Sequence, residues 1–121
     1  MALVDDDERI LESLANLFES AGFSIRAYPS GSLFLQAGFS GVDCLISDIS
    51  MPGIDGFELC ERVKRARPQF PVFLISGRYE AEDMARMACS RATKFFRKPF
   101  DSQRLLMAVE HIFYDKWKGE R

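Results

Sequence analysis

The sequence predicts a doubly wound α/β domain, (βα)5, in which five parallel strands form a central sheet covered by helices on both faces. Short apolar runs alternate with segments of helical periodicity along the whole chain, and each parallel crossover requires a helix. The chain has 121 residues, of which 47% are hydrophobic and 28% charged. This is the size and composition of one ordinary globular domain. We therefore expect a single domain over residues 1–121.

The first elements are short. Residues 1–4 form the expected first strand and stand directly before an acidic cluster, so either this strand is abbreviated or the chain has been trimmed. A helix should follow and end at Gly22, because apolar residues recur at helical spacing at Ile10, Leu11, Leu14, Leu17, Phe18 and Ala21. Residues 23–28 alternate as a strand, and residues 33–37 suggest a short helix before Gly38.

The remaining elements alternate in the same way. Residues 42–47 contain the apolar run of a central strand, residues 51–56 form a turn-rich loop, and the next helix begins at Phe57 and ends before Pro68. The later elements follow the same periodicities: a buried strand over 71–75, a helix around 84–88, a strand over 94–97 and a last helix that starts near Asp101 and runs through Phe113.

Composition excludes several classes of function. The formal charge is −2 and no long Lys/Arg block occurs, which argues against direct nucleic-acid binding by this domain. No apolar stretch approaches the roughly 20 residues of a membrane span and no signal peptide is evident, so we expect a cytoplasmic protein. Cys44, Cys60 and Cys89 lie among apolar neighbours, as buried reduced thiols do. His111, the single histidine, cannot form a histidine metal site, and we expect an ordinary helix residue.

Carboxylates stand where two expected strands end. Asp5 and Asp6 follow the first strand, and Asp48 ends the third. The carboxyl ends of parallel strands meet at one edge of a sheet, so these side chains should converge. Like charges at about 4 Å cost on the order of 4 kcal/mol at an effective dielectric of about 20, which a hard dication reverses. The sequence therefore predicts a site for Mg²⁺ or Mn²⁺.

Two further polar residues end the other strands. Ser76 follows the fourth strand and Lys98 the fifth. A carboxylate nucleophile, a dication, a hydroxyl and an ammonium group are what phosphoryl transfer onto an aspartate requires. Lys98 would bind a phosphoryl oxygen as a point charge, Ser76 would donate a hydrogen bond to another, and Gly77 would leave the approach uncrowded.

At these residues the chain resembles the receiver domain of two-component response regulators, which belongs to the CheY-like superfamily. In its overall sequence pattern it is most similar to receivers of the nitrogen-fixation regulator type. The strongest signal is Asp-x-x-Met-Pro-x-x-Asp-Gly joined to a later Lys-Pro-Phe. The matching segments span nearly the whole chain: Leu3-Val4-Asp5-Asp6, residues 47–59, Leu74-Ile75-Ser76-Gly77 and Phe96-Arg97-Lys98-Pro99-Phe100. The resemblance implies a flavodoxin-like sheet with strand order 2-1-3-4-5.

The resemblance also implies site roles. Asp48 would be the phosphoacceptor and a metal ligand, Asp6 would bind Mg²⁺ directly, and Asp5 would bind it through water. The backbone carbonyl of Ser50 would complete the ligands. Lys98 would pair with the phosphoryl group, and the Lys98–Pro99 bond would be cis, which is rare among X-Pro bonds. Asp7 and Glu8 would then be helix-start residues rather than metal ligands.

Switching in such receivers couples the hydroxyl residue, here Ser76, to an aromatic residue on the fifth strand, here Phe95. The implied partners are a sensor histidine kinase, a second copy through the face of the fourth helix, fifth strand and fifth helix, and a C-terminal DNA-binding domain in a longer regulator. The implied protein is no enzyme beyond its own phosphorylation and dephosphorylation. Such receivers often carry a glycine before the fifth strand, where this chain has Ser90-Arg91-Ala92. Arg91 joins three other cations near the expected output face, Lys94, Arg97 and Arg104. This positive charge argues against the usual dimer surface.

Three other functions would fit parts of this pattern. A phosphate-independent binding module of the same fold is disfavoured by the complete set of Asp5, Asp6, Asp48, Ser76 and Lys98. A flavodoxin-like cofactor domain would offer hydroxyls and amides to a phosphate in its first loop, where this chain has acids. A dehalogenase-type phosphatase would place a second acid two residues after its nucleophile, where this chain has Ser50.

Overall fold

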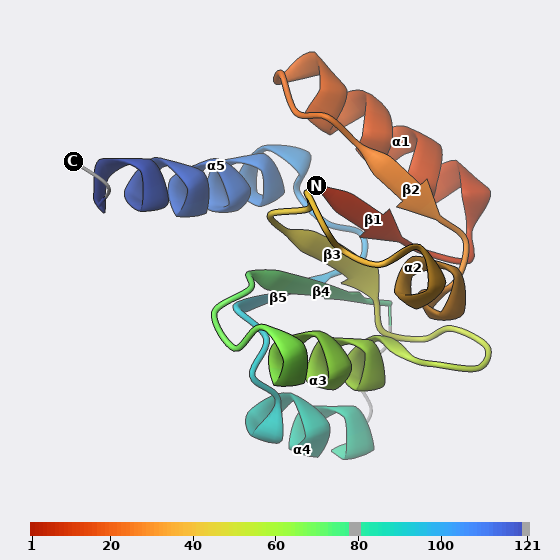
Figure 1. Cartoon of the computed structure of the whole chain (residues 1–121). Helices are drawn as coiled ribbons and strands as arrows, with labels where there is room; N and C mark the ends of the chain where they lie inside the picture. The colour runs from red at the N-terminus through yellow and green to blue at the C-terminus, as the bar shows by residue number, and fades with distance from the viewer. Residues whose placement is uncertain (78–80, 120–121) are drawn as a thin grey trace.

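The computed structural model describes the backbone of residues 1–77 and 81–119 and the side chains of residues 1–77 and 84–113. Its strands are β1 (Ala2–Val4), β2 (Arg26–Tyr28), β3 (Leu45–Asp48), β4 (Val72–Ser76) and β5 (Lys94–Arg97). Its helices are α1 (Glu8–Ser20), α2 (Gly31–Ala37), α3 (Gly56–Ala66), α4 (Ala81–Cys89) and α5 (Ser102–Gly119). The described strands form one parallel sheet in the order β2-β1-β3-β4-β5 (Figure 1), which confirms the predicted fold class.

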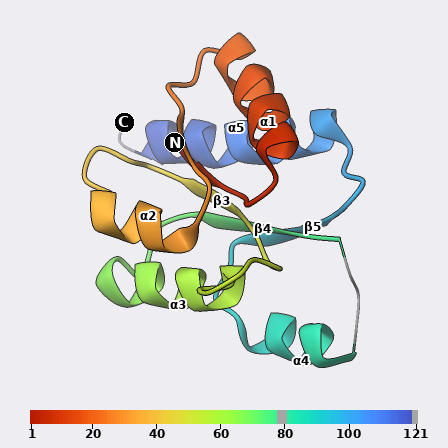
Figure 2. The same cartoon turned by 90° about the vertical axis from the view of Figure 1, so that its right-hand side faces the viewer.

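The sheet separates two apolar layers. Helices α1 and α5 cover one face, and α2, α3 and α4 cover the other (Figure 2). Alternate residues of each strand pack into the two layers, because successive side chains of a strand point to opposite faces. Phe73 and Ile75 pack with the α1 and α5 side, while Val72 and Leu74 pack with the α3 side. The sheet is therefore buried on both faces, as the continuous apolar runs predicted.

The short first strand, β1, lies inside the sheet, between β2 and β3. Its three residues, Ala2–Val4, pair in register with β2 on one side and β3 on the other and are almost fully buried. The amide of Asp5 continues the ladder by donating to the carbonyl of Tyr28 at 3.2 Å. Pairing on both sides thus fixes the direction in which the chain leaves β1, although the strand is brief.

Helix starts follow the capping signals of the sequence. Asp7 caps α1 by accepting a hydrogen bond from the Arg9 amide at 2.9 Å, and Glu8 stands in the first turn, which confirms both as helix-start residues. Asp101 accepts from the amides of Gln103 and Arg104 at the start of α5, as predicted. Gly22, with φ of +95°, follows α1 in a conformation that favours glycine.

Two sequence predictions need correction. The strand expected over 23–28 is present only as Arg26–Tyr28, because the Phe23 amide donates to the Phe18 carbonyl at 3.0 Å and so belongs to the turn that ends α1. Cys44 and Cys60 are buried free thiols, but Cys89, the last residue of α4, is exposed. No helix in the described part of the chain could cross a membrane.

Gly56 begins α3 where the helix approaches the end of β3 most closely. A Cβ there would stand 2.8 Å from the Ile49 Cα and would also overlap the Asp48 carbonyl oxygen. These are backbone atoms, which cannot move aside as a flexible side chain would. Glycine at this position therefore lets α3 start directly behind the residue that ends β3.

Gly56→Ala should destabilise the domain by about 3 kcal/mol, because overpacking against fixed backbone costs at the upper end of the usual range. The matched control is Gly77→Ala, since among the described residues a Cβ at Gly77 would meet only the Lys98 side chain, at an ordinary 3.7 Å. Urea unfolding of both variants measures the difference. Equal stabilities for the two variants would contradict the close approach at Gly56.

Candidate functional site

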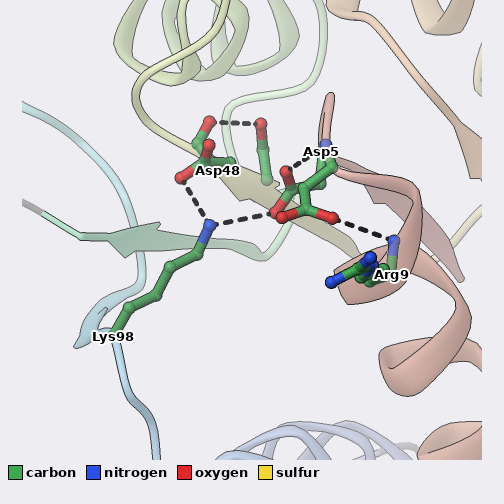
Figure 3. A network of polar contacts seen from close by, with 6 residues as sticks. Asp5, Arg9, Asp48 and Lys98 are labelled. Carbon is green, nitrogen blue, oxygen red and sulfur yellow. Dashed lines mark hydrogen bonds and ion pairs between the residues drawn. The ribbon is translucent and has the colours of Figure 1, made fainter.

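The predicted site residues converge at the carboxyl edge of the sheet. Asp5 follows β1, Asp48 ends β3, Ser76 ends β4 and Lys98 follows β5. Figure 3 shows the carboxylates of Asp5 and Asp48 directed at the Lys98 ammonium from two neighbouring strand ends. The convergence expected from parallel strand ends is thus present for Asp5, Asp48 and Lys98, while Ser76 ends β4, between β3 and β5, and does not line the hollow over the carboxylates.

Lys98 bridges the two buried carboxylates. Its Nζ lies 3.2 Å from Asp5 Oδ2 and 3.3 Å from Asp48 Oδ1. The Asp5 and Asp48 side chains are only 2% and 7% exposed, whereas that of Lys98 is 21% exposed. One ammonium group therefore compensates two carboxylates that are largely withdrawn from water.

Backbone hydrogen bonds hold both carboxylates in place. The Asp7 amide donates to Asp5 Oδ1 at 2.9 Å, which leaves Oδ2 for the ammonium. Next to Asp48, the Ile49 amide donates to the Ile75 carbonyl at 2.9 Å, and the Ile49 carbonyl accepts from the Gly56 amide at 2.9 Å. The position of Asp48 is therefore set by β4 and by the start of α3 together.

The surroundings of the two acids raise the pKa of both. Burial, and after it the negative charge of Asp5, raise the pKa of Asp48 to about 6, although Lys98 opposes both effects. Burial also raises the pKa of Asp5, against the Asp7 amide and Lys98. For Lys98, burial lowers the pKa, but the charges of Asp48 and Asp5 outweigh it and the pKa is raised. The pair of carboxylates thus carries more negative charge than one ammonium group can stabilise.

A hard cation fits the remaining charge. Asp5, Asp6 and Asp48 each offer a carboxylate oxygen, and these oxygens lie within 4.8 Å of one another. Carboxylate oxygens are the ligands that Mg²⁺ prefers, with water filling the rest of its shell. Asp6 is exposed and Asp5 and Asp48 are buried, so the cluster opens toward solvent on the Asp6 side. Ser50 is exposed and stands two residues past Asp48, at the start of the loop between β3 and α3.

Ser76 and Phe95 lie on adjacent strands. Ser76 is buried, and its carbonyl accepts a hydrogen bond from the Lys98 amide at 2.7 Å. Phe95 pairs with Leu74, two residues before Ser76, and is half-buried. Its ring centroid lies 6.3 Å from that of Phe57. The Lys98–Pro99 bond is cis, as the resemblance implied.

Sequence reasoning missed two cations near these residues. Arg86 of α4 makes a two-point ion pair with the Asp55 carboxylate, at 2.8 and 3.1 Å, and its guanidinium lies 4.4 Å from the Phe57 ring centroid. Arg9 lines the hollow over the carboxylates. Only the position of Arg9, in the first turn after the acidic cluster, could have been noticed in the sequence. The contact between Arg86 and Asp55 joins residues 31 positions apart and has no local signal.

Comparisons with known proteins agree with this geometry. The family model for the response regulator receiver domain matches residues 1–110. The transcriptional regulatory protein FixJ of Bradyrhizobium diazoefficiens is 34% identical over 110 residues, which cover 89% of this chain and 53% of that protein. The response regulator protein TodT of Pseudomonas putida is 34% identical over 108 residues, which cover 88% of this chain and 48% of that protein. The chain therefore spans about half the length of these curated relatives.

A solved structure shows the same fold. The BeF3-activated DrrB receiver domain superposes with a TM-score of 0.85 at 25% identity, over 93% of this chain and 95% of that one. The described sheet order and the placement of helices on both faces thus match those of a receiver domain.

Asp48→Asn should stabilise the Mg²⁺-free protein at pH 7.5 by about 1–3 kcal/mol. The folded-state pKa of Asp48, about 6, lies above the ordinary value of 3.8, so ionisation costs stability. That cost is absent below about pH 4 and is complete above about pH 6. Urea unfolding should show a higher free energy of unfolding for the variant than for the wild type at pH 7.5. This difference should be smaller at pH 4.5 and should disappear when Mg²⁺ is added.

Asp43→Asn is the matched control, because Asp43 is exposed and precedes β3 at the opposite end from Asp48. It should change stability little at either pH. A variant Asp48→Asn that is less stable than wild type at pH 7.5 would mean that the ion pair with Lys98 outweighs the cost of burial.

Proposed function

Because the chain belongs to the response regulator receiver domain family, we propose that it is a phosphorylation-dependent switch in which Asp48 accepts a phosphoryl group from a sensor histidine kinase. The observation that supports this most is the ammonium of Lys98 within 3.3 Å of carboxylate oxygens of both Asp5 and Asp48. A nucleophilic carboxylate, a cation-binding acid and a phosphoryl-binding ammonium are thereby within reach of one another.

Each residue has a role in this proposal. Asp5, Asp6, Asp48 and the Ser50 carbonyl would hold Mg²⁺ or Mn²⁺, which supplies positive charge between the nucleophile and the phosphoryl oxygens. An Asp48 oxygen attacks phosphorus, the bond from phosphorus to the donor nitrogen breaks, and the imidazole leaves with its electron pair. Lys98 turns from Asp48 to a phosphoryl oxygen, so the charge it compensates changes partner without leaving the site.

Transmission would begin at Ser76 and Phe95. The Ser76 hydroxyl donates to a phosphoryl oxygen, and Phe95 moves into the space that this vacates. Phe95 has room for such a motion because β5 is an edge strand and the ring is half-buried. A packing element with two arrangements shifts its population when one charge-assisted contact favours one of them.

The partners follow from the same proposal. The domain at residues 1–121 would be the cytoplasmic receiver of a longer regulator with a C-terminal DNA-binding domain. Its output face would consist of α4, β5 and α5, through which a second copy also binds. Arg91, which the sequence grouped with the cations of that face, pairs instead with Glu61 of α3 at 3.5 Å. Its charge is thus partly compensated before any partner binds.

The phosphoacceptor is tested by intact-protein mass after incubation with acetyl phosphate. One phosphoryl addition is expected, only when Mg²⁺ is present, and it should be lost in Asp48→Asn and kept in Asp43→Asn. Labelling of Asp48→Asn at the wild-type rate would refute the assignment. No labelling of a wild type that binds Mg²⁺ would favour the phosphate-independent module.

A further inference from the structure

A second cationic side chain besides Lys98, that of Arg9, lines the hollow over the carboxylates. The hollow has a volume of about 590 Å³ and is lined by Asp5, Asp6, Asp7, Glu8, Arg9, Asp48 and Lys98. Arg9 lies in the first turn of α1, and its amide donates to the Asp7 carboxylate at 2.9 Å, so the helix cap fixes its backbone beside the cluster. Figure 3 shows Arg9 next to Asp5, on the side of the cluster away from Lys98.

The two cations differ in what they already contact. Lys98 is engaged by Asp5 and Asp48. Arg9 is exposed, and within the described part of the chain its guanidinium forms no ion pair within 4.0 Å. The lining therefore offers an incoming anion one uncommitted guanidinium at the solvent side of the hollow.

Such an anion meets an unfavourable field without Arg9. Five of the seven lining residues are acids. Carboxylate oxygens of three of them, Asp5, Asp6 and Asp48, lie within 4.8 Å of one another, which is less than the Debye length of about 8 Å at physiological salt. A phosphoryl donor enters as a dianion and would be repelled. A guanidinium offers several N–H donors in a planar fork that suits phosphoryl oxygens.

Building on the proposed function, we propose that Arg9 binds the phosphoryl group of the incoming donor at the mouth of the hollow and guides it to Asp48. Arg9 contacts the donor through its guanidinium and takes no part in bond making. The same positive charge opposes Mg²⁺ at the acidic cluster. Removal of that charge therefore has opposite effects on the two ligands: the donor reacts more slowly and the cation binds more tightly.

Two measurements on the full chain test this role. The first is the second-order rate constant for phosphorylation by acetyl phosphate at saturating Mg²⁺, followed by intact mass. The second is the Mg²⁺ dissociation constant without donor, by calorimetry. Arg9→Gln should lower the rate constant about 3–10-fold and lower the dissociation constant about 2–3-fold, and both effects should shrink in 0.5 M salt, because surface charges are screened.

Two variants serve as references. Arg9→Lys keeps the charge and loses the fork, so it should restore the wild-type Mg²⁺ affinity and recover the rate only in part. Arg65→Gln removes a charge from the last turn of α3, where the side chain is 74% exposed, and should change neither quantity.

Each outcome is decisive. A wild type that is not phosphorylated refutes the proposed function itself. A phosphorylated wild type with an Arg9→Gln variant unchanged in rate overturns the role of Arg9 alone. A slower Arg9→Gln variant that also binds Mg²⁺ more weakly overturns it too, because Arg9 would then support the acidic cluster structurally instead of binding the donor.

Discussion

The site depends on one ammonium group shared between two buried carboxylates. Lys98 reaches Asp5 across 93 residues of sequence and Asp48 across the adjoining strand end. Two carboxylates are withdrawn from water, and only one ammonium group compensates their negative charges. Burial and the neighbouring Asp5 carboxylate therefore raise the pKa of Asp48. In the proposed function a dication would relieve this excess of negative charge, and a phosphoryl group would then offer Lys98 a new partner. In the proposed switch, cation binding and phosphorylation together change how this excess negative charge is compensated.

The fold fixes the positions of the two carboxylates. Strand β1 is brief, yet it is hydrogen-bonded on both sides, so Asp5 leaves the sheet in a fixed direction. Gly56 lets α3 begin against the backbone of Asp48 and Ile49, and the Asp55 carboxylate caps that helix while also binding Arg86 of α4. Helices α3 and α4 are thus tied to the segment that carries Asp48, the proposed phosphoacceptor.

The sequence predicted most of the fold, because apolar periodicity and capping residues such as Asp7 and Asp101 act locally. It also predicted that Asp5, Asp48 and Lys98 meet, because parallel strand ends converge. It could not predict the length of β2, since the turn formed by the Phe23 amide depends on how α1 ends. Nor could it predict the exposure of Cys89 or the pairs of Arg86 and Arg91, which arise from helix packing between distant segments.

The shared ammonium is tested most directly by a carbon-13 NMR titration of the side-chain carboxyl of Asp48, without and with saturating Mg²⁺. We expect titration near pH 6 in the Mg²⁺-free protein, because burial and Asp5 outweigh Lys98, and a clear fall in that pKa when the cation is bound. Titration near the ordinary value of 3.8, unchanged by Mg²⁺, would show that Lys98 alone balances the site. The imbalance proposed to drive the switch would then not exist.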